Sequence, residues 1–226
     1  MFVRLIYLKN KNDFKQMKQL LILGAGGMGK EIYYTARHSI GYGVEFEVKG
    51  FLDFPNPDWD TSVYPPILGM EDDYEIQPDD VFTCSVGDVH LKRKICEKMK
   101  ARGAKFQTLI FDNAQIGDNV SIGEGCIIDP YARIGADVKI GENCLVQTFA
   151  IVGHDAIVGD YCRLDCRSLL VGGVILGNNV TIHTNAVVSH KVVVEDDATV
   201  AAMSFVIRKV KKGSIVIGNP AKRLVF

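Results

Sequence analysis

Hydrophobic residues follow two different patterns along the chain, and the change falls near Leu109. Before this point, buried apolar runs alternate with amphipathic segments. The pattern predicts strands over 18–24, 45–53 and 80–87, and helices over 29–39 and 90–103. An alternation of strand and helix is typical of a small α/β unit with a parallel sheet.

From Ile116 to Val206, an aliphatic residue recurs at every sixth position without one insertion. Small or β-branched residues follow four positions later, as Cys126 follows Ile122. Such a repeat predicts a parallel β-helix, in which neighbouring coils bury each other's apolar edges. The repeat resembles the left-handed hexapeptide β-helix, and this likeness implies three hexads for each triangular coil. Residues eighteen positions apart should then stack at the strand spacing of about 4.8 Å.

Four of the cysteines fall within this repeat, and three of them are predicted to be packing residues. Cys126, Cys144 and Cys162 lie eighteen positions apart, which places them in one inward column of small apolar fillers. The chain shows no secretion signal, which disfavours a disulfide among them. Cys162 and Cys166 lack the further ligands that a zinc site needs.

The composition is that of an ordinary globular protein, with 226 residues, of which 47% are hydrophobic and 23% are charged. A net charge of -1 argues against nucleic acid or an anionic membrane as the main partner. The apolar run at the start is too short for a signal peptide or a membrane span, so the expected location is cytoplasmic. Because "MKQLLILGAGG" reads as the natural start of the first strand, residues 1–17 are predicted to be a poorly ordered extension.

The segment "IVGHDAIVGD" interrupts the hexads with His154 and Asp155 side by side. Their positions in the hexad turn a corner of the predicted coil, so neither side chain faces the core. One coil further along, the same corner carries Gly172 and Gly173. A histidine beside bare backbone leaves room for a ligand to lie against the coil. The alternative is a solvated corner histidine without a function.

The first domain contains a phosphate-binding pattern. The motif "GAGGMG", from Gly24 to Gly29, fits G-x-G-x-x-G between a strand and a helix, where backbone N–H groups and the helix dipole can receive a phosphate. Alone, the motif indicates a nicotinamide dinucleotide. Asp53 comes later than the acid of such sites, however, and the unit is only half a dinucleotide fold. A tight turn without any ligand also remains open.

The whole chain resembles the sugar O-acyltransferases of the sialic acid O-acetyltransferase type and their relatives, the N-acetyltransferases of nucleotide-linked 4-amino sugars. The resemblance rests on "LILGAGGMGKEI", "GFLD", "SVGDVHLKRKI", the hexads, "GHDAIVGD" and "GSIVIGNPAKRL". It implies an α/β, Rossmann-like nucleotide-sugar-binding domain over 18–108, a left-handed parallel β-helix acyltransferase domain over 109–207, and a tail near coenzyme A over 208–226. It also implies a homotrimeric, acetyl-CoA-dependent acetyltransferase for bacterial surface glycans, with acetyl-CoA between two β-helices.

The resemblance assigns the family's catalytic histidine to His154, as general base on the acceptor amine or hydroxyl. An imidazole suits this task because its pKa lies near the operating pH. Asp155 takes the place of the acid that orients the ring, and Gly172 that of the glycine whose N–H faces the acetyl carbonyl. Arg163 stands where the amino-sugar members have a second histidine. An arginine cannot relay a proton, but it can bind a carboxylate or a phosphate.

The resemblance also implies two sets of binding residues. The expected coenzyme A contacts are Gly172, Gly173, Lys211, Gly218, Asn219, Pro220 and Lys222. The expected contacts of the nucleotide sugar or sialic-acid-like acceptor are Gly24, Gly26, Gly27, Met28, Gly29, Asp53, Gly87, Asp88 and Arg163.

Two rival interpretations follow from the same residues. A carbonic-anhydrase-like β-helix is disfavoured and no metal is expected, because His190 lies two coils from His154 whereas zinc ligands sit at about 2.1 Å from the metal. The other rival is a non-catalytic or nicotinamide-dinucleotide-binding protein that uses the β-helix as a trimeric scaffold. The sequence leaves open the identity of the sugar and the choice between N- and O-acetylation.

Overall fold

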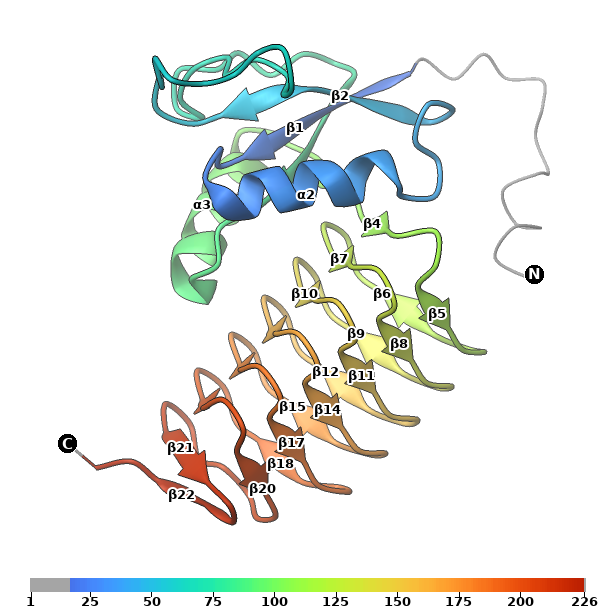
Figure 1. Ribbon diagram of the computed structural model, residues 1–226, viewed down its shortest axis with the longest axis vertical. Coiled ribbons are helices and arrows are strands. Elements are labelled where there is room, and N and C mark those ends of the chain that lie inside the picture. The colour runs from blue at the N-terminus through green and yellow to red at the C-terminus, as the bar shows by residue number, and fades with distance from the viewer. Residues whose placement is uncertain (1–16, 226) are drawn as a thin grey trace.

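The computed structural model describes residues 17–225, with an α/β domain set against one side of a long triangular solenoid (Figure 1). The predicted N-terminal extension, residues 1–17, lies outside the described residues apart from Met17. Within the described part of the chain, no helix is long and apolar enough to cross a membrane.

The first domain contains a three-stranded sheet and two helices. Its elements are β1 (Lys18–Leu23), α2 (Gly27–Arg37), β2 (Phe46–Leu52), β3 (Asp80–Cys84) and α3 (Val89–Ala101). The strand order is β2-β1-β3, and both pairings are parallel. The central strand β1 is buried from Leu20 to Leu23, as expected for a parallel strand covered on both faces. These elements confirm the strands, helices and parallel sheet predicted from the sequence.

The solenoid is built from short strands that form three faces. The covered face, against which the first domain packs, contains β4 (Leu109–Ile110), β7 (Ile127–Ile128), β10 (Leu145–Val146), β13 (Arg163–Leu164), β16 (Thr181–Ile182), β19 (Thr199–Val200) and β21 (Ile215–Gly218). The second face contains β5 (Gln115–Ile116), β8 (Arg133–Ile134), β11 (Ile151–Val152), β14 (Leu169–Leu170), β17 (Val187–Val188) and β20 (Phe205–Val206). The third face contains β6 (Ser121–Ile122), β9 (Lys139–Ile140), β12 (Ile157–Val158), β15 (Ile175–Leu176) and β18 (Val193–Val194). Ile151 pairs in parallel with Leu169, which confirms the predicted stacking of residues eighteen apart.

One residue at each corner of the solenoid adopts the left-handed backbone conformation, and these residues recur every six positions. They are Asn119, Gly125, Tyr131, Asp137, Asn143, Phe149, Asp155, Tyr161, Arg167, Gly173, Asn179, Asn185, Lys191, Asp197 and Met203. Most are Asn, Asp or Gly, which tolerate a positive φ best. Corners at this spacing turn the chain from one face to the next, and the fold is the parallel β-helix that the hexads predict, left-handed as the resemblance implies.

The inward side chains form one continuous aliphatic core along the solenoid. Cys144 and Cys162 lie buried in the predicted column as free thiols. Their Sγ atoms lie 3.0 Å from the carbonyl oxygens of Gly159 and Gly177, which accept from these weak donors. Burial raises the pKa of the Cys144 thiol, which keeps it protonated and unreactive. The cysteines therefore serve as packing residues, as predicted.

The first domain is fixed to the covered face by apolar contacts. Leu109, Ile127 and Leu145 point outward from the solenoid, yet they are buried in one cluster with Leu20 and Ile22 of β1. Each face of a triangular solenoid lies opposite one corner. The corner between the second and third faces, which we call the distal corner, therefore lies on the side away from the first domain of its own chain.

Both helices of the first domain also contact the solenoid. On α2, the Thr35 hydroxyl donates a 2.8 Å hydrogen bond to the buried carboxylate of Asp129. On α3, the Arg93 guanidinium lies 5.5 Å from the centre of the Tyr161 ring. These contacts hold the glycine loop and the turn before α3 in fixed positions relative to the coils.

The stack of coils extends past both ends of the hexad series. Ile110 on β4 precedes Ile116, and after Val206 the strand β21 still pairs in parallel with β19. Ile215 pairs with Thr199, so this last coil is two residues shorter than the others. The shortening breaks the six-residue period, which is why the sequence pattern ends too early. A final strand, β22 (Ala221–Arg223), folds back antiparallel on β21.

Candidate active site

His154 and Asp155 occupy the distal corner, directly after β11, and both side chains are exposed. The Nδ1 atom of His154 lies 2.6 Å from the Oδ2 atom of Asp155. A carboxylate at this distance accepts from Nδ1–H and leaves Nε2 as the unprotonated ring nitrogen. The aspartate therefore reaches the ring although it is one methylene shorter than a glutamate.

Gly172 lies directly against the imidazole of His154. A Cβ atom built on Gly172 would lie 2.5 Å from Nε2 and 2.6 Å from Cε1 of the ring, which is closer than real Cβ atoms approach. Gly173, the next residue, donates its N–H to the carbonyl oxygen of His154 at 2.8 Å. The structure thus brings His154, Asp155, Gly172 and Gly173 together, and only glycine fits beside the ring.

The backbone N–H of Gly172 has no hydrogen-bond partner within residues 17–225. At another corner of the solenoid, the corresponding N–H groups of Asp160 and Asn178 donate to the side chains of Asn178 and Asp196, at 2.8 and 2.9 Å. The distal corner lacks such a ladder because the residue after Gly172 in this column is His190. Gly172 therefore offers a free N–H donor beside Nε2 of His154, at a place where buried backbone donors are normally paired.

Outward aliphatic residues surround the distal corner in the coils that carry His154. Ile151, Ile157 and Ile175 keep 39%, 44% and 42% of their surface exposed. The two faces beside the corner thus form an exposed apolar surface. Exposed apolar residues that cluster in this way mark an interaction surface.

A column of cations lies at the distal corner; the sequence indicated Arg208, as part of a basic tail near the phosphates of coenzyme A, but sequence reasoning missed Lys191. Lys191 and Arg208 follow Gly172 at this corner on the next two coils, and both are exposed. Neither takes part in an ion pair within the described residues, whereas the neighbouring Lys209 pairs with Glu195. The sequence contains the signal for this column, because Lys191 lies eighteen positions after Gly173 and Arg208 lies thirty-six positions after Gly172.

The predicted contacts in the tail lie elsewhere in the same chain. Gly218, Asn219 and Pro220 form the turn between β21 and β22, with a cis peptide bond before the proline. Lys211 and Lys222 are exposed. Because β21 continues the covered face, this hairpin is not beside the distal corner of its own chain.

The glycine loop combines two structural glycines with two that face open space. A Cβ atom on Gly24 would lie 2.7 Å from Ser85 Oγ, and one on Gly29 would overlap the carbonyl oxygen of Gly24. Around Gly26 and Gly27 no atom lies within 4 Å of the built Cβ positions. Gly26 is the N-cap of α2 and provides no side-chain cap, so the first N–H groups of the helix are available to an anion.

The remaining predicted acceptor residues gather at the same end of the sheet. The Oδ2 atom of Asp53 accepts from the N–H of Ala25 at 2.6 Å, and the Asp88 carboxylate accepts from Leu91 N at 2.8 Å as the N-cap of α3. Asp53 therefore braces the glycine loop, and Asp88 fixes the start of α3.

Arg163 connects this end of the sheet to the solenoid, since its Nη1 donates to the carbonyl oxygen of Gly87 at 3.0 Å. On the other side, its Nε donates to Asp165 Oδ1 at 2.5 Å. A Cβ atom on Gly87 would also lie 3.5 Å from Cε of Met28. The structure thus brings Arg163, Gly87 and Met28 to one point and places them away from His154 of the same chain.

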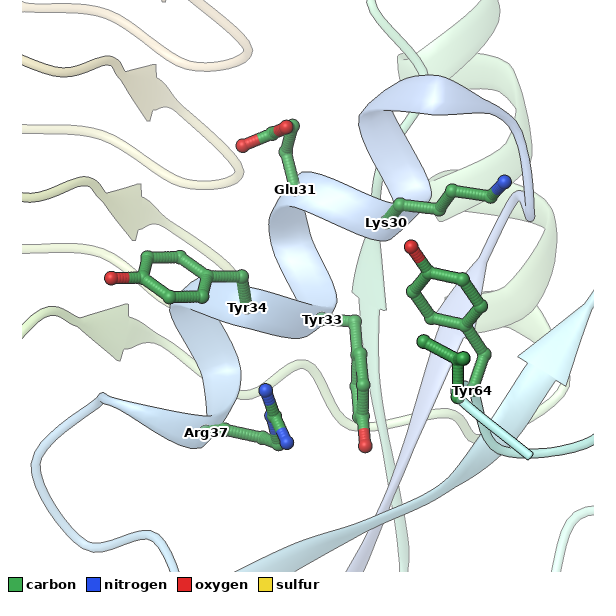
Figure 2. A pocket seen from close by; sticks show the side chains of 7 residues that line it. Lys30, Glu31, Tyr33, Tyr34, Arg37 and Tyr64 are labelled. Carbon is green, nitrogen blue, oxygen red and sulfur yellow. The ribbon is translucent and has the colours of Figure 1, made fainter. Parts of the chain in front are cut away.

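Two hollows occur in the surface, and the larger one borders His154, because Gly135 and Ala136 of the preceding coil line it. One, of about 390 Å³, lies on the outer side of α2, where Lys30, Tyr33, Arg37 and Tyr64 surround it (Figure 2). The other, of about 1100 Å³, lies at the first coils and includes Arg133. No group of three or more His, Cys, Asp or Glu side chains that could hold a metal ion occurs within residues 17–225.

Two family models match the chain, one on each domain. The model described as PglD N-terminal domain matches residues 19–99, and the model described as GMPPB C-terminal domain matches residues 105–206. A comparison with curated proteins found no match.

Solved structures match nearly the whole chain. The acetyltransferase domain of PglB from Neisseria gonorrhoeae FA1090 is 27% identical, with a TM-score of 0.83 over 92% of this chain and 100% of that chain. The same domain is also known in complex with acetyl coenzyme A. PerB from Caulobacter crescentus, in complex with CoA and GDP-perosamine, is 26% identical, with a TM-score of 0.80 over 92% of this chain and 97% of that chain.

The fold and these likenesses define a hexapeptide-repeat acetyltransferase. The α/β domain ahead of the β-helix, which the PglD N-terminal model matches, then places the chain among the sugar acetyltransferases of this class. The family resemblance and the enzyme class drawn from the sequence are both confirmed.

Proposed function

We propose that the protein transfers the acetyl group of acetyl-CoA to the amino group of a nucleotide-linked sugar, with His154 as general base. The observation that carries this proposal is the distal corner, where His154 has a carboxylate on Nδ1 and a free backbone donor beside Nε2. The similar PglB domain is known with acetyl coenzyme A, and PerB with CoA and GDP-perosamine, which supports both substrates. The predicted cytoplasmic location belongs to the same proposal.

Each group at the distal corner has a defined task in this reaction. The acceptor amine attacks the thioester carbonyl carbon, and Nε2 of His154 takes the proton that the amine loses. The carbonyl oxygen gains negative charge and accepts from the Gly172 N–H. When the C–S bond breaks, the imidazolium returns the proton to the leaving sulfur of coenzyme A. Asp155 holds the ring in the required tautomer and stabilises its charged form.

The position of the first domain favours a catalytic site shared between subunits. The acceptor's nucleotide would bind at the glycine loop, but this domain packs on the covered face of the solenoid (Figure 1). His154 lies at the distal corner, opposite that face. The exposed Ile151, Ile157 and Ile175 beside His154 offer the surface for a second copy. We therefore propose a homotrimer in which His154 of one chain serves the acceptor bound to its neighbour, with acetyl-CoA between two β-helices.

The experiment is an assay of thiol release from acetyl-CoA, with mass analysis of the products, across UDP- and GDP-linked amino sugars. The His154→Ala variant should lose transfer by about 10²–10⁴-fold. Full activity of this variant would refute His154 as the base. Thiol release without mass added to any amino sugar would refute N-acetylation.

Mixed trimers test the shared site. Gly27→Asp adds a carboxylate to the first turn of α2, where there is space for it but where a phosphate would be repelled. His154→Ala and Gly27→Asp should each be inactive alone and should regain part of the activity when unfolded and refolded together. An absence of regained activity, with mixed oligomers present, would refute the arrangement. Binding of NAD instead of nucleotide sugars would favour the rival dinucleotide-binding function.

A further inference from the structure

The side chains of Arg163, Asp165 and His183 form a network beneath the first domain. Asp165 is only 4% exposed, and its two oxygens accept from different partners: Oδ1 from Arg163 Nε at 2.5 Å, and Oδ2 from His183 Nδ1 at 2.8 Å. Arg163 keeps 25% of its side-chain surface exposed. A buried carboxylate therefore holds a partly open arginine in one orientation.

Two separate contacts fix the plane of the guanidinium. Asp165 binds Nε, and the carbonyl oxygen of Gly87 binds Nη1 at 3.0 Å. The Nη2 atom has no partner within residues 17–225. A planar guanidinium with one edge fixed presents its remaining N–H groups in a defined direction, which is the property that suits arginine to phosphate recognition.

The fixed guanidinium lies beside the open start of α2. A Cβ atom on Gly87 would lie 2.9 Å from Nη1 of Arg163 and 3.5 Å from Cε of Met28, in the first turn of that helix. Gly26 and Gly27 face open space there, and Gly26 provides no side-chain cap. An arginine edge and the positive end of a helix thus converge, and both attract an anion.

The nearby carboxylates do not fill this position. Asp53 is bound by Ala25 N at 2.6 Å, and Asp88 is bound by Leu91 N at 2.8 Å. Their contacts brace the loops around the opening. The site has donors from two domains of one chain and is built to receive a charged group from outside.

We infer that Arg163 binds a phosphate of the acceptor's nucleoside diphosphate in the same chain, and that Asp165, with His183, is the positioning residue for it. This inference rests on the proposed function and gives Arg163, an expected acceptor contact, a specific partner in the diphosphate. An arginine in this place cannot exchange a proton with the sugar, so its task is binding and it should act on acceptor affinity more than on the chemical step.

The experiment measures binding of UDP and GDP to the intact protein by calorimetry, with uridine and guanosine as probes that lack phosphate. Loss of one charge-assisted hydrogen bond should weaken diphosphate binding about 10–100-fold. Arg163→Gln should show this loss with both nucleotides and leave nucleoside binding unchanged. Arg163→Lys should remain weak, because a lysine keeps the charge but not the fork of donors. Arg133→Gln is the matched control, since Arg133 has the same hexad position on the exposed second face.

Asp165→Asn tests the positioning role. It should weaken diphosphate binding and raise the KM for the acceptor while kcat changes little, a split that general loss of structure would not produce. If Asp165→Asn does not fold, Arg163→Gln alone tests the inference. The Arg163 side chain is partly exposed to solvent, so its replacement should not prevent folding. Wild-type affinity of Arg163→Gln for UDP and GDP, in a protein that still transfers acetyl groups, would overturn the inference and leave the proposed function intact. Binding of neither nucleotide to the unaltered protein would overturn the acceptor class and the inference together.

Discussion

The substitution Gly172→Ala separates the chemistry of the distal corner from its stability. The added methyl group would lie 2.5 Å from Nε2 of His154, whereas carbon atoms pack at about 3.5 Å, so the ring must move by about 1 Å. A misplacement of about 1 Å in a catalytic group costs up to about 100-fold in rate, or about 2.7 kcal/mol in the activation barrier.

The same substitution should not destabilise the fold. Gly172 does not adopt a left-handed φ, and the His154 side chain is 66% exposed and free to swing away. A change from glycine to alanine at a compatible position stabilises by about 0.4–1 kcal/mol, because the unfolded chain loses freedom. We therefore expect an unchanged or slightly raised melting temperature together with the loss of activity.

The assay measures kcat/KM for acetyl transfer and thermal unfolding, in both the unaltered and the His154→Ala backgrounds. If Gly172→Ala acts through the ring, it should cause no further loss once His154 is absent. Activity equal to that of the unaltered protein, or an equal loss in both backgrounds, would refute the reasoning. A fall in melting temperature that parallels the loss of activity would show a general packing defect instead.

The two remaining predictions concern the cation column and a buried carboxylate. Lys191→Gln and Arg208→Gln should each raise the KM for acetyl-CoA about tenfold, by loss of contacts with its phosphates. Transfer from acetyl-N-acetylcysteamine, a donor without these phosphates, should stay unchanged, and an equal effect on both donors would count against the column. Lys209→Gln is the control and should change neither, because Lys209 already pairs with Glu195. Burial raises the pKa of Asp129 to about 6. Because this pKa lies above the value in the unfolded chain, protonated Asp129 stabilises the folded state at low pH, and this contribution to the free energy of unfolding is lost as the pH rises through about 6. Asp129→Asn, which keeps an acceptor for Thr35, should remove this pH dependence and raise the free energy of unfolding at pH 7–8 by up to about 3 kcal/mol. Denaturant titrations from pH 4 to 8 measure it. An unchanged pH dependence in the variant would show that the carboxylate is not responsible.

The hexads predicted which residues point inward, and the three-hexad coil that the family resemblance implies predicted how the coils stack. Together they placed Cys144 and Cys162 in the core and His154 at a corner. The short last coil was not predicted, because Ile215 pairs with Thr199 only sixteen positions earlier and this breaks the six-residue period. Periodicity predicts only those coils that keep it.

The sequence pattern could not show which face the first domain covers. All three faces carry outward residues at equivalent hexad positions, and apolar ones such as Leu145 and Ile157 look alike in the repeat. Only packing distinguishes them, since Leu145 is buried beneath β1 whereas Ile157 remains exposed. For the same reason, the contact of Arg163 with Gly87 was not predicted, because these two residues lie 76 positions apart in the chain.

The distribution of outward residues connects assembly to catalysis. On the early coils, the two uncovered faces carry polar outward side chains: Gln115, Arg133, Ser121 and Lys139. The outward positions become aliphatic from Ile151 onward, in the coils that carry His154 and Gly172. An apolar exterior is therefore not a requirement of the repeat, which folds equally well with charges at these positions. On the two uncovered faces, the apolar exterior is restricted to the coils that carry His154. There, one chain provides the proposed base but only one side of the proposed acetyl-CoA groove. The surface that would bring a second chain into contact is thus the surface that would complete the site, so in the arrangement proposed here a separated monomer should fold and remain inactive.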